Sequence, residues 1–195
     1  MRRAFVASRI LDTDTVVAHG DIYVPNDSEV DFDEGLRQVT QFYDPFAEYC
    51  IKNGLTLCFE NLFDPTPAHR RYCARLSELK AIIKHYDSPN VCVCWDTGHG
   101  RISNPAGQIP ALNEIGEKIR ALHLHDNYFD KDLHLCPMMG KEDWPELIKA
   151  LKKINYPGVF TFEFVYGAFS DTVLLSLLKV YRQIGIELTQ MWEEA

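Results

Sequence analysis

The chain has 195 residues, a formal net charge of −8 and 46% hydrophobic residues, a composition typical of a globular protein with a substantial apolar core. The acidic balance, without a cluster of lysine and arginine, disfavours nucleic acid as a partner. No apolar run approaches the ~18 residues of a membrane span, and the first residues are too mixed for a signal peptide, so we expect one cytoplasmic domain over residues 1–195.

Short runs of strand-forming residues alternate along the chain with longer segments of helical periodicity. Residues 2–11 look like the end of a helix. The strands that we predict after them are residues 15–20, 55–60, 91–96, 119–125 and 159–164. The helices that we predict are residues 33–53, 67–86, 105–116, 143–154 and 170–192. This alternation predicts βα units and a parallel sheet.

Side chains alternate in character along the predicted strands. In residues 55–60, bulky apolar residues occupy one face, and the other face is small and then polar, ending in Glu60. Three later strands repeat this division. A closed parallel barrel needs such strands, because helices cover its outside and its sites lie at the carboxyl ends of the strands. An open sheet covered on both faces would not place ionisable groups there, so we predict an α/β fold of the TIM-barrel, (β/α)8, type.

Four ionisable residues share the inner face near the ends of four predicted strands: Glu60, Asp96, His123 and Glu163. Three carboxylates in one place raise one another's pKa, and a divalent cation reverses that effect. Carboxylate oxygens with one imidazole suit Mn²⁺, Mg²⁺ or Co²⁺, with Zn²⁺ as a further candidate. We therefore expect these residues to hold one divalent metal ion. Any one of them alone would be explained equally well as a charge solvated at the end of a strand.

Further histidines lie near the same strand ends. His99 follows the third strand in its loop, and His19 and His125 end predicted strands on the inward face, so we expect all three to bind substrate. Asp132 and His134, in the next loop, are candidates for additional metal ligands or for residues that close over the substrate. A pair of solvated loop residues would have the same pattern.

The remaining reactive and aromatic residues have structural interpretations. The six cysteines form no zinc-type or redox CxxC pair, and four lie in apolar segments, so we interpret them as reduced and structural. His69 and His85 lie on predicted helices and are interpreted as surface residues. Trp95 and Trp144 are interpreted as residues of the core.

Several stretches together resemble the sugar phosphate isomerase/epimerase group of the xylose isomerase-like TIM barrels, whose relatives include ketose 3-epimerases and endonuclease IV. They are CFEN, CWDTGHG, HLHDNYFDKDLH and GKEDWPELIKALKKINYPGVFTFEF. The resemblance implies that the four inner-face residues bind one divalent metal. Endonuclease IV has further ligands, whose counterparts would be His19, His99, Asp132 and His134. The family's loop of proline, glycine, any residue and glycine reads Pro137-Met138-Met139-Gly140 here.

The resemblance also implies a partial barrel. The sequence starts where the third helix of such a barrel would end, so we expect about five βα units without the first three strands. Two strand edges would then be open, at residues 15–20 and 159–164. We expect a second copy of the chain or a complementing N-terminal segment to cover them.

The activity implied by the resemblance is that of a metal-dependent sugar or sugar phosphate isomerase or epimerase. Glu60 and Glu163 would take and return a proton next to a carbonyl, through an enediolate, while His99 holds a substrate hydroxyl. Two alternatives stay open. One is an endonuclease IV-like metal-dependent phosphodiesterase, and the other is an inactive sugar-binding or assembly remnant.

Overall fold

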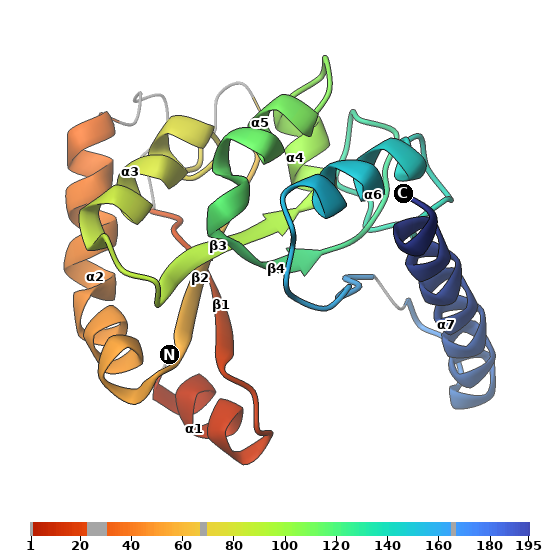
Figure 1. Cartoon of the computed structure of the whole chain (residues 1–195), viewed down its shortest axis with the longest axis horizontal. Helices are drawn as coiled ribbons and strands as arrows, with labels where there is room; N and C mark the ends of the chain where they lie inside the picture. The colour runs from red at the N-terminus through yellow and green to blue at the C-terminus, as the bar shows by residue number, and fades with distance from the viewer. Residues whose placement is uncertain (1, 23–30, 67–69, 165–166) are drawn as a thin grey trace.

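The computed structural model of the protein describes residues 2–22, 31–66, 70–164 and 167–195. Four parallel strands form one sheet in the order β1-β2-β3-β4: β1 (Thr15–His19), β2 (Thr56–Glu60), β3 (Val91–Asp96) and β4 (Ile119–His123). The helices are α1 (Arg2–Ile10), α2 (Phe32–Asn53), α3 (Leu76–Tyr86), α4 (Thr97–Ser103), α5 (Ile109–Ile115), α6 (Trp144–Lys153) and α7 (Asp171–Glu194). A 3-10 turn, η1 (Gly116–Lys118), leads into β4. Helices and parallel strands alternate along the chain, as predicted (Figure 1).

The two faces of the sheet differ as the alternation of side chains predicts. Leu57, Phe59 and Trp95 belong to the main apolar core, which the strands share with the helices. The opposite face carries a separate small cluster, formed by Cys58, Cys92 and Cys94 with Val17 and Ala121 packed against them. This inner face leads to the polar strand ends.

A register shift in the β3–β4 pair determines where His123 points. The register shifts by one residue, so that Arg120 is an extra residue on β4. Ile119 lies in the main core, and strict alternation would direct His123 there as well. The shift instead pairs His123 with Asp96, and both side chains reach the inner face.

Residues 159–164 do not form the predicted fifth strand. In this segment the structure has one isolated parallel bridge, between Leu124 and Phe162. A longer ladder does not form because Asp126, the next residue of this strand that faces the segment, pairs with Leu135 instead: the Asp126 N–H donates to the Leu135 carbonyl over 2.8 Å. On the β3 side, β4 ends two residues before its predicted limit, where the His125 N–H donates to Thr97 Oγ1 over 3.1 Å.

Two predicted helices begin later than expected. The helix predicted at residues 67–86 begins at Leu76, after Cys73, whose φ of 71° is incompatible with a right-handed helix. The helix predicted at residues 105–116 begins at Ile109, after Gly107 with a φ of 128°. The other predicted helices are confirmed within two residues of their limits.

Helix α4 follows β3 directly and was not predicted. Gly98 and Gly100 lie within it, and glycine is a poor helix former. Asp96 compensates by capping the helix: its Oδ1 accepts a hydrogen bond from the His99 N–H over 2.7 Å. The cap holds the loop that carries His99 against the end of β3.

The structural interpretations of the other residues are largely confirmed. Trp95 and Trp144 are buried in the main core. All six cysteines are buried and free. His85 is exposed, whereas residue 69 lies outside the described residues.

Helix α7 projects away from the sheet, with its C-terminal end beside α6 (Figure 1). It has 24 residues, of which Leu188 alone is buried. Leu175 and Leu178 are 61% and 43% exposed. Among the described residues, no helix combines the length and the apolarity needed to cross a membrane.

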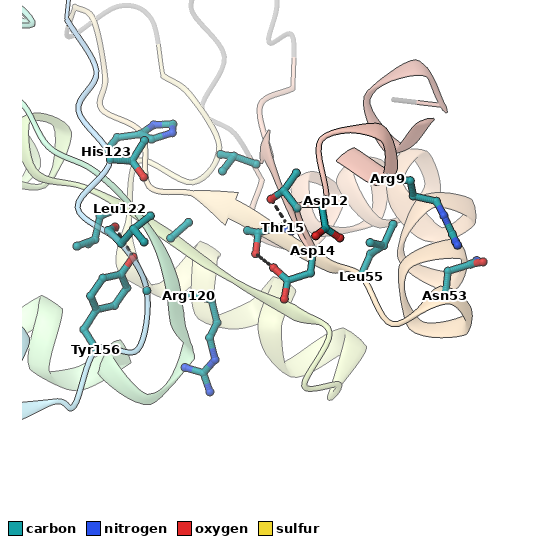
Figure 2. A pocket seen from close by; sticks show the side chains of 16 residues that line it. Arg9, Asp12, Asp14, Thr15, Asn53, Leu55, Arg120, Leu122, His123 and Tyr156 are labelled. Atoms are coloured by element: carbon teal, nitrogen blue, oxygen red, sulfur yellow. Dashed lines mark hydrogen bonds between the residues drawn. The ribbon is translucent and has the colours of Figure 1, made fainter. Parts of the chain in front are cut away.

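A cavity of about 820 Å³ lies between β1 and the residues that follow α6. Figure 2 shows Thr15 on one side of it and Leu122 and Tyr156 on the other, with His123 above them. In a closed eight-stranded barrel, layers of side chains fill this region. The cavity therefore marks the side on which the described strands do not close.

Candidate metal centre

The four residues predicted to bind a metal meet at the carboxyl ends of the strands. Glu60 ends β2, Asp96 ends β3 and His123 ends β4, while Glu163 comes from the segment bridged to Leu124. Each offers one ligand atom, and these atoms lie within 4.8 Å of one another. Because parallel strands bring their carboxyl ends to one edge, residues distant in sequence form a single cluster.

His123 lies between the two glutamates of the cluster. Its Nδ1 is 3.0 Å from Glu60 Oε2 and 2.9 Å from Glu163 Oε2. The Glu60 side chain is 1% exposed and that of Glu163 is 40% exposed. One carboxylate is therefore buried in the sheet while the other faces the open side.

The donors in this cluster fit a divalent cation. Both carboxylate oxygens of Glu60, Nδ1 of His123 and Oε2 of Glu163 are buried without a hydrogen-bond partner among the described residues, although they are close enough for ion pairs. Leaving such groups unsatisfied costs free energy. Three carboxylates and an imidazole are also the ligand types that Mn²⁺, Co²⁺ and Zn²⁺ accept.

The charges of the cluster are balanced by its histidines when no cation is bound. Burial would raise the pKa of Glu60, but contacts with His123, His19 and His99 hold that pKa far below its usual range. Burial would lower the pKa of His99, but Asp96, Asp132 and Glu60 raise it to about 10. The carboxylates and imidazoles thus stabilise each other's charged forms, and a cation that binds between them competes with protons for the same atoms.

Asp96 is held in place through both its carboxylate and its backbone. His125 Nε2 lies 2.9 Å from both of its oxygens, and His125 itself is fully buried. Asn61 accepts a hydrogen bond from the Asp96 N–H over 2.7 Å and donates to the Asp96 carbonyl over 2.9 Å. Gly98 is needed here, because a Cβ at this position would clash with the His125 ring. The sequence analysis did not select Asn61 as a site residue. Its position directly after Glu60 is the feature that could have indicated it.

A second group of ligand-type residues adjoins the first. His99, His125, Asp132 and His134 offer atoms within 4.8 Å of one another. Asp132 Oδ2 is 3.0 Å from His134 Nε2 and 3.3 Å from His99 Nε2. The predicted extra ligands, Asp132 and His134, therefore surround a point next to the four-residue cluster rather than joining it.

The other predicted pocket residue, His19, lies at the open edge of the sheet. Its side chain is 54% exposed, and its Nε2 is 3.4 Å from Glu60 Oε2. The cluster is therefore reached by histidines from β1 and from the loops after β3 and β4. His19 is the one of them that solvent reaches freely.

The loop 137–140 is organised by Asp126, which the sequence analysis missed. The Asp126 carboxylate accepts hydrogen bonds from the Gly140 N–H over 3.0 Å and from Trp144 Nε1 over 2.9 Å. A Cβ on Gly140 would clash with this carboxylate. Met138, where the family pattern has glycine, has a φ of 72°, in the region that favours glycine.

A comparison with models of protein families shows the family to which the chain belongs. The model of the xylose isomerase-like TIM barrel family matches residues 1–183. The chain belongs to this family. The predicted family and its partial-barrel architecture are thereby confirmed, with four strands and one bridged segment in place of five strands.

Solved structures similar to the chain include a protein titled epimerase-like and a sugar epimerase that shares the fold. A solved D-tagatose 3-epimerase-like protein is 28% identical, with a TM-score of 0.71, and the match covers 95% of this chain and 68% of that protein. L-ribulose 3-epimerase, 18% identical, shares the fold with a TM-score of 0.74 over 98% of this chain and 67% of that one. The uncharacterized protein y4fM of Sinorhizobium fredii is 30% identical over 155 residues, which are 78% of this chain and 48% of that protein. The chain spans about half the length of the curated relatives it matches.

Proposed function

We propose that the protein is a metal-dependent isomerase or epimerase of a sugar or sugar phosphate. The observation that carries this proposal is the pair of carboxylates, Glu60 and Glu163, each within 3.0 Å of His123 Nδ1 in a cluster of buried, unsatisfied ligand atoms. The likeness to epimerases supports the class of substrate. The reaction is proton abstraction next to a carbonyl.

The residues of the cluster have separate roles in this reaction. A divalent cation held by Glu60, Asp96, His123 and Glu163 would polarise the substrate carbonyl and stabilise the enediolate. Glu163, which is half-exposed, takes the carbon-bound proton on one face, and Glu60, in its carboxylic acid form, donates a different proton on the other face. Proton exchange with solvent then restores both groups. A carboxylate on each side of the enediolate permits inversion at that carbon.

The histidines around the cluster hold the substrate and the ligands. His99 and His19 bind substrate hydroxyls from the loop after β3 and from the edge of β1. His125 acts through Asp96, because both oxygens of that carboxylate lie 2.9 Å from its Nε2. This arrangement fixes one ligand from behind while the open side of the cluster receives the sugar.

Metal binding should depend strongly on Asp96. Because Asp96→Asn removes a charged ligand and leaves His125 a neutral acceptor, we expect Mn²⁺ affinity to fall by at least about 100-fold. Isothermal titration of both proteins measures this loss, and Asp130→Asn, an exposed change in the 126–135 loop, is the matched control. Equal affinity in the parent and Asp96→Asn would mean that the ion binds elsewhere.

Solvent exchange tests the reaction itself. The metal-loaded protein, incubated with a set of ketoses and ketose phosphates in heavy water, should place one deuterium on carbon, since the abstracted proton exchanges on a carboxylate. Mass spectrometry of the recovered sugars measures the label. Isomerisation without any label would contradict the proposal and favour hydride transfer.

A second candidate function is phosphodiester cleavage at abasic sites in DNA. The adjoining group of His99, His125, Asp132 and His134 favours it, because it offers ligands for a second ion beside the first. The net charge of −8 argues against a DNA substrate. Uptake of two or more ions together with cleavage of an abasic duplex would favour this function over the first.

A further inference from the structure

A buried thiol lies beside the proposed metal ligands. Cys94 is 0% exposed and lies on β3, where it pairs with Glu60 of β2. Alternation along β3 directs Cys94 to the same face as Asp96. One atom each from Cys94, Glu60 and His123 lies within 4.8 Å of the others.

The neighbouring ligand atoms make ion-pair contacts but no hydrogen bonds among the described residues. Both Glu60 oxygens and His123 Nδ1 are buried without a hydrogen-bond partner among the described residues. Cys92 differs from Cys94 although it lies on the same strand and the same face. Its Sγ donates a hydrogen bond to the Pro89 carbonyl over 3.2 Å, and it belongs to none of the ligand groups in the described residues.

We propose that Glu60, Cys94 and His123 form a second, softer ligand set of this centre, which takes thiophilic divalent ions such as Cd²⁺, Co²⁺ and Zn²⁺. Thiolate sulfur favours such ions, whereas carboxylate sets suit Mg²⁺ and Mn²⁺. On binding, the Cys94 S–H bond breaks, a sulfur–metal bond forms and the proton leaves to solvent. The inference rests on the proposed metal centre, since it uses two of the same residues.

The two ligand sets exclude each other because they share Glu60 and His123. An ion in the thiol set does not use Asp96 or Glu163. Asp96 lies at the end of β3, and Glu163 lies in the half-exposed segment. Cys94 lies two residues before Asp96 along β3. An ion bound to sulfur is therefore drawn toward the interior of the sheet, away from the open side where the sugar would bind.

Cobalt reports sulfur ligation directly. Co²⁺ bound through sulfur has a charge-transfer band in the near ultraviolet, which oxygen and nitrogen ligands do not produce, and its visible bands report binding of either kind. We expect the near-ultraviolet band in the parent protein and in Cys92→Ser, but not in Cys94→Ser. We also expect Cys94→Ser to weaken Cd²⁺ binding by at least about tenfold and Mg²⁺ binding by less than about twofold.

The outcomes separate this inference from the proposed function. Visible Co²⁺ bands in the parent without a sulfur band would overturn the role of Cys94 and leave the four-residue centre intact. A parent that binds neither Co²⁺ nor Cd²⁺ would overturn both. Loss of the band in Cys92→Ser as well as in Cys94→Ser would overturn the assignment to Cys94, and thermal melts show whether each variant is folded.

Discussion

Replacing Glu163 with glutamine should reduce solvent exchange into a ketose by about 10²- to 10⁴-fold, the usual contribution of a general base. Glutamine keeps the size of the side chain but cannot accept the substrate proton. The change should leave the fold intact, because the Glu163 side chain is 40% exposed and the segment is held by its backbone: the Glu163 N–H donates to the Leu124 carbonyl over 3.2 Å. The rate of deuterium incorporation, measured by mass spectrometry at saturating metal, checks this result.

A control must separate the loss of a base from the loss of a metal ligand. Metal affinity is therefore measured on the same Glu163→Gln sample, and the assay is run at an ion concentration that fills its site. Glu146→Gln, an exposed change of the same kind in the first turn of α6, should exchange at the parent rate. If Glu163→Gln recovers the parent rate once its site is filled, Glu163 is a ligand and not the base.

The cluster could be predicted from the sequence because a strand repeats every two residues. Glu60 and Asp96 follow alternating runs of small and bulky residues, so the inner face of each strand could be inferred without knowledge of the fold. His123 lies on the predicted inner face for a less direct reason. His123 lies on the same face as Ala121, two residues earlier, as alternation predicts. The extra residue Arg120 puts Ile119 on the opposite face, although Ile119 is also an even number of residues away. Only the pairing with β3 reveals that irregularity.

The parts that were not predicted depend on contacts between distant residues. The predicted fifth strand is absent because the backbone of Asp126 pairs with Leu135 rather than with residues 159–164, a competition that no local pattern records. No periodic sequence pattern marks Asn61 or Asp126, because each acts through hydrogen bonds to backbone groups of another segment. Helix α4 depends on the Asp96 cap, which outweighs two glycines. Local sequence preferences therefore predict helices and strands. The loops that complete a site depend on hydrogen bonds between distant segments, which those preferences do not contain.

The open side of the sheet should make the purified chain associate with itself. β1 is the edge of the sheet, so its outer backbone groups lack a partner strand among the described residues. A parallel edge with few charges favours pairing with another chain. Helix α7 adds an apolar surface, because Leu175 and Leu178 are exposed in its N-terminal half, ahead of the contact between Tyr181 and the Phe164 ring. Burying one leucine of this kind stabilises a contact by about 1.5–3 kcal/mol.

Light scattering across a range of concentrations should show dimers or larger species that dissociate on dilution. The double change Leu175→Glu and Leu178→Glu should shift the equilibrium toward the monomer, because each glutamate would have to lose its hydration in the contact. Ser176→Glu, between them on the same exposed helix, adds a charge without removing apolar surface, and it should dissociate the assembly less. A monomer with a cooperative melt at every concentration would show that the chain itself stabilises this edge. Addition of a polypeptide that carries further strands of the barrel should compete with self-association, because both would pair with the same edge of β1.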